Sequence, residues 1–179
     1  MTPLAARSLD AFPNWLRSLA DDARQLAAVV ENRELPSGAR RSAALALNYL
    51  FRSLDLIPDG LEDLGFIDDA FVFRVAAASA SPDDQKADPS GTLARLADEI
   101  GLVREFMSDV YPRLEAYVGG LGDASARGRS VSEVLSDDAA LADFVRDAKQ
   151  WADGYQVPAF SRDEKNLVKL KSFLTARLK

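Results

Sequence analysis

Apolar residues recur along this chain at intervals of three and four positions, and no segment alternates steadily between apolar and polar residues. The first spacing gathers apolar side chains on one face of an α-helix, whereas steady alternation is typical of a half-buried β-strand. The sequence therefore predicts an all-α fold, a compact bundle of about six or seven helices. Because the chain has 179 residues, it can bury a stable core without metals or disulfides, and we expect a single domain over residues 1–179.

Prolines, glycines and polar capping residues mark where these helices begin and end. Ser130 with Glu133, and Ser161 with Glu164, match the capping-box pattern, so helices are expected just after both serines. Residues 81–90 are polar and include two prolines, which predicts an internal linker between residues 39–80 and additional helices in residues 91–179. The expected helices cover residues 14–32, 38–54, 68–80, 92–119 with a restart near residue 108, a short segment after residue 130, residues 138–154, and a last segment after residue 161.

The chain contains no cysteine and no histidine. Disulfides, thiolate nucleophiles, the usual Cys/His zinc sites and imidazole general bases are therefore excluded. Any catalysis would rest on carboxylates, lysine, tyrosine or serine, and any metal would have oxygen ligands, which favours Mg²⁺, Ca²⁺ or Mn²⁺. The formal net charge of −6 disfavours a nucleic-acid partner, because phosphates require a basic surface. No cofactor is expected.

The expected location follows from two features of the sequence. The first residues lack the basic head and continuous apolar stretch of a secretory signal, and no window holds the ~18 apolar residues of a membrane-spanning helix. The absence of disulfides agrees with a reducing compartment. We therefore expect a cytoplasmic protein.

The densest chemical feature is the segment 55–69, which holds six carboxylates between two strongly apolar helices. A connection this short and rich in proline and glycine predicts that the two helices fold back as an antiparallel hairpin, around which we expect the bundle to be built. Residues 51–80 hold six acids and two arginines, whereas residues 154–179 hold two acids and six bases. This opposition would let the basic tail dock on acidic surface of the same molecule.

Three short motifs in this region resemble the signature of a known family. Tyr49-Leu50, then Asp55-Leu56-Ile57-Pro58-Asp59 and Gly65-Phe66-Ile67-Asp68-Asp69-Ala70 are similar to the pattern of the YkvA-like proteins, the domain of unknown function 1232, over residues 39–78. Ser53 stands where members often have proline, which predicts a longer second helix here. The resemblance implies a small helical module of mostly bacterial proteins, some with membrane-associated relatives and none with an established activity. The motif residues it implies are Asp55, Pro58, Asp59, Gly65, Asp68 and Asp69.

Two interpretations of these motif residues stay open. In the structural one, which we favour, Asp68 is an N-cap of the third helix, Pro58 and Gly60 shape the turn, and Asp55 or Asp69 pairs with an arginine, Arg52 or Arg74. In the functional one, several carboxylates aim at one point and bind a divalent cation, Mg²⁺ or Ca²⁺, although the spacing is not that of an EF-hand. The candidate ligands are Asp55, Asp59, Asp68 and Asp69.

The last expected helix carries basic residues beside a stripe of leucine and phenylalanine, namely Lys165, Lys169, Lys171 and Arg177. This pattern is compatible with adsorption to an anionic membrane and equally with a solvated face of a packed terminal helix. The function predicted from the whole sequence is a non-enzymatic interaction or scaffold module that offers its acidic hairpin rim or an apolar groove to a protein partner. The alternatives are a peripheral membrane protein that uses the basic helix and a divalent-metal-dependent enzyme or sensor that uses the motif aspartates.

Overall fold

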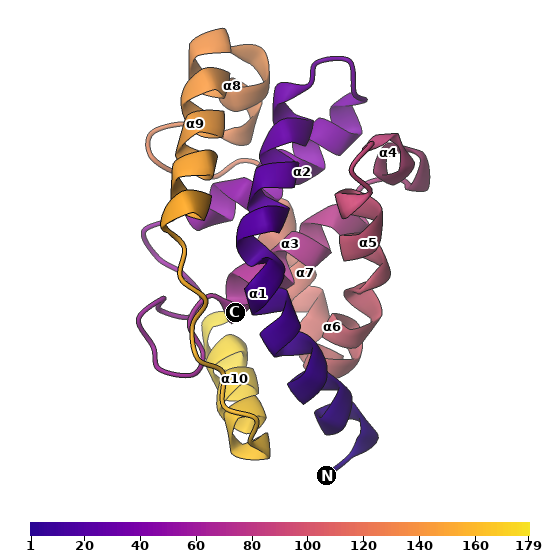
Figure 1. The fold of residues 1–179 in the computed structure, drawn as a ribbon, viewed down its shortest axis with the longest axis vertical. Helices are drawn as coiled ribbons and strands as arrows, with labels where there is room; N and C mark the ends of the chain where they lie inside the picture. The colour runs from indigo at the N-terminus through magenta and orange to yellow at the C-terminus, as the bar shows by residue number, and fades with distance from the viewer.

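The structure, a computed structural model, describes residues 1–179 and consists of helices and their connections, without a β-strand (Figure 1). Six of the helices have ten or more residues, and the others are short. The all-α prediction is therefore confirmed. The helices are α1 (Pro3–Glu31), α2 (Ser37–Leu50), α3 (Ile67–Ser79), α4 (Pro82–Ala87), α5 (Thr92–Asp98), α6 (Ile100–Met107), the 3-10 helix η1 (Ser108–Val110), α7 (Tyr111–Gly120), α8 (Val131–Ser136), α9 (Asp138–Gly154) and α10 (Glu164–Arg177).

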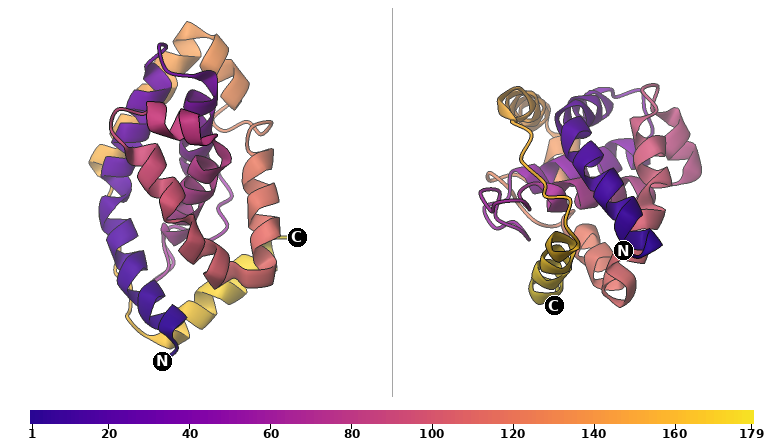
Figure 2. Two further views of the ribbon diagram at one scale, coloured as in Figure 1. Left: turned by 90° about the vertical axis from the view of Figure 1, so that its right-hand side faces the viewer. Right: turned by 60° about the horizontal axis from the view of Figure 1, so that its bottom comes forward.

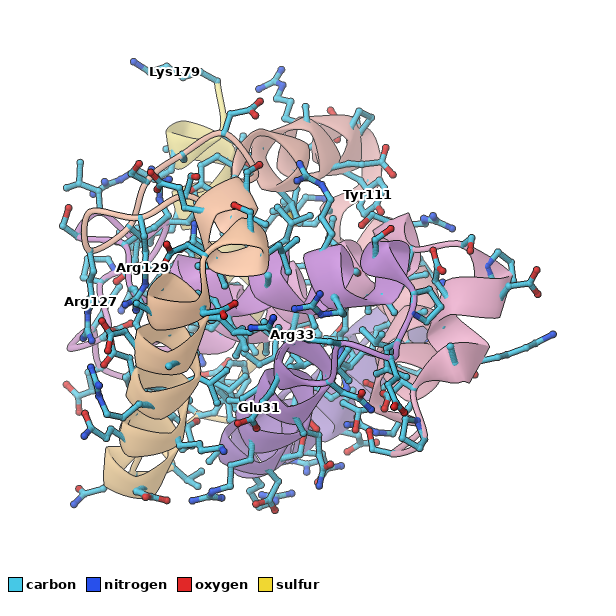
Figure 3. All side chains as sticks on the ribbon, turned by 90° about the horizontal axis from the view of Figure 1, so that it is seen from above. Glu31, Arg33, Tyr111, Arg127, Arg129 and Lys179 are labelled. Carbon is cyan, nitrogen blue, oxygen red and sulfur yellow. The ribbon has the colours of Figure 1, made fainter.

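The long helix α1 runs along the molecule and packs on α2, α9 and, at its first turns, α10. Figure 2 shows α10 at the end of the molecule where α1 begins. At the other end, exposed ion pairs join α1 and its following turn to α9, between Glu31 and Lys149 at 3.4 Å and between Arg33 and Asp138 at 2.5 Å (Figure 3). At the end where α1 begins, the Met1 amino group pairs with Glu164 at the start of α10, at 3.4 Å.

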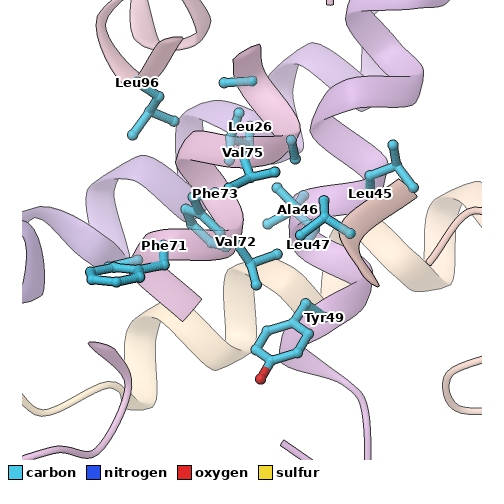
Figure 4. Packing of buried hydrophobic residues seen from close by; sticks show 14 of the residues in the cluster. Leu26, Leu45, Ala46, Leu47, Tyr49, Phe71, Val72, Phe73, Val75 and Leu96 are labelled. Carbon is cyan, nitrogen blue, oxygen red and sulfur yellow. The ribbon is translucent and has the colours of Figure 1, made fainter. Parts of the chain in front are cut away.

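Helix α3 lies at the centre, with α1, α2, α5, α6 and α7 around it. All of its residues from Ile67 to Ala77 are buried, as expected for a helix that is apolar on every side. Val72 and Val75 of α3 pack with Leu47 of α2, Leu26 of α1 and the neighbouring helices (Figure 4). The α2–α3 pair therefore forms the expected hairpin inside the core.

The first two helices differ from the expected ranges. Helix α1 begins at Pro3, because Thr2 Oγ1 accepts a hydrogen bond from the Ala5 N–H at 3.1 Å and the helix continues through Pro13. Proline there removes one backbone hydrogen bond, but Leu9 and Phe12 are buried on the same helix, and their burial outweighs that loss.

Helix α2 ends earlier than predicted, at Leu50. The chain turns at Phe51, whose N–H donates to the carbonyl oxygen of Asn48 at 3.2 Å. Leaving the helix here lets Leu56 and Ile57 reach the core, while Leu54 stays 74% exposed. The serine at position 53 therefore does not extend the helix.

The predicted helix starts are confirmed in part. Ser130 and Glu133 form the expected capping box, and the chain restarts at Ser108, which has a left-handed φ of 54°. The predicted helix start at Ser161 is wrong. Asp163 is the N-cap of α10, and its carboxylate accepts a hydrogen bond from the Lys165 N–H at 2.9 Å. Residues 81–90 contain the short helix α4. No helix of the structure combines the length and apolar character that crossing a membrane requires.

Candidate functional site

A buried hydrogen-bond cluster joins the two helices of the hairpin to the loop between them. Tyr49 on α2 donates its hydroxyl to Asp68 Oδ2 on α3, and the Ile57 N–H donates to the same oxygen at 3.0 Å. The Leu56 N–H in turn donates to the Tyr49 hydroxyl oxygen at 2.7 Å. Tyr49 and Asp68 have no exposed surface. We call these four residues the Tyr49–Asp68 clamp, which fixes α2, the loop and α3 at one point.

The clamp changes the expected role of Asp68. The residue at the N-cap position of α3 is Phe66, with a left-handed φ of 64° and no capping side chain, whereas Asp68 lies in the first helical turn. The N-cap prediction was therefore wrong. The Asp68 carboxylate does not cap its own helix. It accepts hydrogen bonds from the Tyr49 hydroxyl at the end of α2 and from the Ile57 N–H in the loop.

Two other motif residues shape the loop backbone. A Cβ at Gly65 would lie 2.1 Å from the Asp59 carbonyl oxygen, so only glycine fits there. The Pro58 carbonyl oxygen accepts from the Leu61 N–H at 2.9 Å and closes a turn. Gly60, in contrast, has free space around its Cα, so the close approach at Gly65 is the one that requires a glycine.

Asp69 is the most unusual carboxyl group in the molecule. It is 2% exposed, forms no ion pair, and its Oδ2 has no hydrogen-bond partner. Burial raises its pKa well above the usual range, and the nearby charges of Asp68, Asp59 and Asp55 raise it further. Because Asp68 receives two hydrogen bonds and Asp69 receives no comparable support, we infer that Asp69 carries the proton and Asp68 the charge.

The two outer motif aspartates lie where the loop meets solvent. Burial raises the pKa of Asp55 to about 7, Asp59 and Asp68 raise it too, and Arg52 opposes the shift. Asp59 is exposed, but neighbouring protein atoms remove part of the water around its carboxylate, and this desolvation raises its pKa. Neither Asp55 nor Asp69 forms the expected ion pair with Arg52 or Arg74. Arg74 pairs with Glu99 instead, at 2.5 Å. Near neutral pH Asp55 is therefore only partly ionised.

The four aspartates do not form a metal-binding group. No set of three or more carboxylates in the structure is placed to hold a metal ion. Asp68 binds the hydroxyl and the Ile57 amide of the clamp, Asp69 follows it in the first turn of α3, and Asp55 and Asp59 lie in the loop. The structure thus offers no ligand set for the predicted Mg²⁺ or Ca²⁺ site at Asp55, Asp59, Asp68 and Asp69.

Asp69→Asn should make the protein more stable at pH 8 and leave its stability near pH 5 almost unchanged. Unfolded aspartate titrates near ~3.9, whereas the folded pKa of Asp55 is about 7 and that of Asp69 is also raised. Between these values the folded state binds more protons, so the free energy of unfolding falls as pH rises. Urea unfolding from about pH 5 to 9 measures this slope. The Asp69→Asn variant should show a flatter slope than the wild type. Glu62→Gln, in the exposed part of the loop, is the control and should keep the wild-type slope. Equal slopes for Asp69→Asn and wild type would contradict the assignment of the proton to Asp69.

A second feature is an apolar groove between the first turns of α1, α6 and α10, with a volume of about 570 Å³. We call it the terminal groove. Lys171 lines it together with the apolar residues Leu4, Ala5, Phe106, Leu167, Val168 and Ala176. At 100° per residue, Lys165 and Lys169 lie at the edge of the α10 face that lines the groove, and Arg177 lies on the opposite side.

The basic residues of α10 are not used for docking the tail. Ion pairs are spread over the surface of the protein. None of them includes the four predicted membrane residues, Lys165, Lys169, Lys171 and Arg177. The tail instead contacts the acidic loop through Asn166, whose Nδ2 donates to the Asp63 carbonyl oxygen at 3.0 Å. Outside α10, Arg162 of the tail pairs with Asp10 of α1, so one basic residue docks on an acidic side chain as expected, whereas the contact with the acidic loop is neutral.

The sequence pattern did not reveal a charge network in which two buried residues, Arg74 and Asp22, pair with the partly exposed Glu99 and Arg95. Arg74 has no exposed surface and lies 3.8 Å over the Trp15 ring, beside its ion-pair partner Glu99. Arg95 pairs with Asp22, which is 3% exposed. The one available signal was an arginine inside an otherwise largely apolar helix, because its partners come from α1 and from the junction of α5 and α6.

Comparison with known proteins gives a match to one family model, over the hairpin. No curated protein and no solved structure matches the chain. A family model does match, over the segment that contains α2 from Ala39, the acidic loop and α3 as far as Arg74. Residues 39–74, which include the clamp, are thus a match to the family described as Protein of unknown function (DUF1232).

Proposed function

We propose that this protein is a non-enzymatic interaction module whose terminal groove binds an acidic amphipathic helix of a partner protein. The observation that supports the proposal is an open apolar groove bordered by lysines that have no acidic partner within the chain. Helix-in-groove recognition needs an apolar trough and matching charges along its edge. The groove volume of about 570 Å³ lies within the range of binding pockets, about 300–1,000 Å³.

The apolar side chains of the groove remain available to a partner. Val168 is 67% exposed on α10, and Phe106 closes the floor of the groove from α6. An amphipathic helix presents apolar residues at every third or fourth position, and its polar flank would face Lys171 and Lys169. Carboxylates on that flank would complete the ion pairs that these lysines lack.

A protein helix is favoured over a membrane surface because the apolar stripe of α10 is already occupied. Leu170 and Leu174 have no exposed surface and pack on the body of the protein. A helix that lies in a membrane interface inserts its apolar face among the acyl chains. Membrane adsorption would therefore require α10 to detach, whereas a helix can enter the groove without rearrangement.

The first experiment identifies what occupies the groove in the cell. A photo-crosslinking residue replaces Val168 in the full-length protein, and the matched control carries it at Ala139, which is exposed on α9. We expect a crosslink at position 168, absent at position 139, to a segment with an apolar stripe and acidic flank. Crosslinks to lipid alone, or the same proteins at both positions, would overturn the proposal.

Lys171→Glu should weaken binding of that crosslinked segment, prepared as a synthetic peptide, by about tenfold. Reversing one charge at the groove edge replaces an attraction by a repulsion, and the binding free energy should change by about 1.4 kcal/mol in total, which is tenfold in affinity. Fluorescence anisotropy measures the affinity. Arg113→Glu is the control, since Arg113 is exposed on α7 and lies outside the groove. Equal weakening by both variants would show a general charge effect and count against the groove.

Full-length protein is also sedimented with vesicles of phosphatidylglycerol and of phosphatidylcholine. We expect no difference between the two, because the apolar face of α10 is packed. Pelleting with the anionic vesicles that Lys171→Glu abolishes would contradict the helix assignment in favour of a membrane.

A further inference from the structure

A separate pocket lies between the loop that follows α2 and the loop that precedes α8. Its volume is about 300 Å³, and residues from both loops line it: Phe51, Arg52 and Ser53 from the first, Ser125 and Arg127 from the second. Two guanidinium groups and two hydroxyls therefore lie around one small cavity. It is far from the terminal groove in the sequence and shares no lining residue with it.

The second loop concentrates positive charge beside this pocket. Arg127 and Arg129 both pair with the same oxygen of Asp147, Oδ2, at 3.3 and 2.7 Å (Figure 3). Their guanidinium groups lie 4.7 and 5.6 Å from the centre of the Phe51 ring. One carboxylate thus serves two arginines, while the neighbouring Arg146 pairs with Asp143 at 2.7 Å and approaches the other Asp147 oxygen at 3.7 Å. The charge of Asp147 does not balance this group.

The first loop adds an arginine that has no ion pair. Arg52 interacts with Asp55 over a longer distance, and the pKa of about 7 means that Asp55 is only partly ionised near neutral pH. The Nε of Arg52, which lines the pocket, is buried and has no hydrogen-bond acceptor. Buried donors without acceptors are rare in folded proteins, and each one calls for a partner that the chain does not supply.

We propose that this pocket binds the phosphoryl group of a small phosphorylated molecule. A phosphate dianion offers several oxygens in a tetrahedral arrangement, so it can accept hydrogen bonds from donors on opposite walls. Here the donors are Arg52 and Ser53 on one loop and Arg127 and Ser125 on the other. A carboxylate carries a single charge and two oxygens in one plane, so it offers fewer acceptor positions to donors on opposite walls. The number of donors and their position on two loops therefore favour phosphate.

The test titrates the ¹⁵N-labelled full-length protein with inorganic phosphate and with glycerol phosphate at about pH 7.5. Chloride at equal ionic strength and acetate serve as anion controls. We expect saturable shifts of the amide signals of residues 51–54 and 125–127, with both phosphates and with neither control. Unsaturated shifts, or equal shifts with acetate or chloride, would overturn the proposal.

Three variants distinguish a phosphate site from general attraction. Arg127→Gln removes an exposed guanidinium, and Arg52→Lys keeps the charge but removes the forked donor; each should weaken phosphate binding about tenfold or more. Arg33→Gln is the matched control, since Arg33 also forms an exposed ion pair with an aspartate but lies outside the pocket. Unchanged affinity in Arg127→Gln, or equal weakening in Arg33→Gln, would contradict the site.

Discussion

Arg74→Ala should lower the free energy of unfolding by about 2–5 kcal/mol, because it truncates a large, fully buried side chain and breaks its ion pair with the partly buried Glu99. The Arg74 side chain has no exposed surface, pairs with Glu99 at 2.5 Å, and donates to the Ala70 carbonyl oxygen at 2.9 Å. Truncation leaves Glu99 without this partner and opens a cavity against the Trp15 ring. Urea unfolding at pH 7 measures the loss.

Two further variants separate the charge from the packing. Arg104→Ala is the matched control, because Arg104 also lies over an aromatic ring, that of Tyr111 at 5.4 Å, but is exposed on α6. It should cost less than about 1 kcal/mol. Arg74→Met combined with Glu99→Gln removes both charges and refills the space, so it should recover at least half of the loss. A cost of Arg74→Ala no larger than that of the control would show that the network does not support the fold.

The fold class could be predicted from the sequence because the spacing of apolar residues is a local property. The ends of the helices were harder, because each depends on which side chains the rest of the chain can bury. Pro13 is a local signal to stop a helix, yet α1 passes through it since Leu9 and Phe12 are held in the core. The Ser161 motif failed in the same way, since Asp163 lies nearer to the first buried residues of α10.

The candidate sites likewise have features that are local in the sequence and features that depend on the folded chain. The motif residues of the hairpin could be found from their spacing, and the family match confirms that segment. Their roles could not, because Asp68 meets Tyr49 and the Ile57 amide only after the loop has folded back. The terminal groove joins residues from the two ends of the chain, such as Leu4 and Val168, and no local pattern relates them.

Asp68→Ala should lower the free energy of unfolding by about 2–4 kcal/mol. The substitution leaves the Tyr49 hydroxyl and the Ile57 N–H without their acceptor in a region that excludes solvent. Each buried donor left unpaired costs about 1–3 kcal/mol, and removing a buried charge returns part of that cost. Asp68→Asn keeps an acceptor oxygen and should lose about half as much. Urea unfolding at pH 7 gives the values for both variants.

The neighbouring aspartate provides the matched control for this prediction. Asp69 is as buried as Asp68, but the Tyr49 hydroxyl and the loop amide do not bond to it, so Asp69→Ala creates a similar cavity without breaking the clamp. Asp69→Ala should therefore cost clearly less than Asp68→Ala. Combining Asp68→Ala with Tyr49→Phe should cost less than the sum of the two single losses, because both disrupt the same hydrogen bonds. Additive losses, or equal losses at the two aspartates, would mean that packing alone holds α2 against α3.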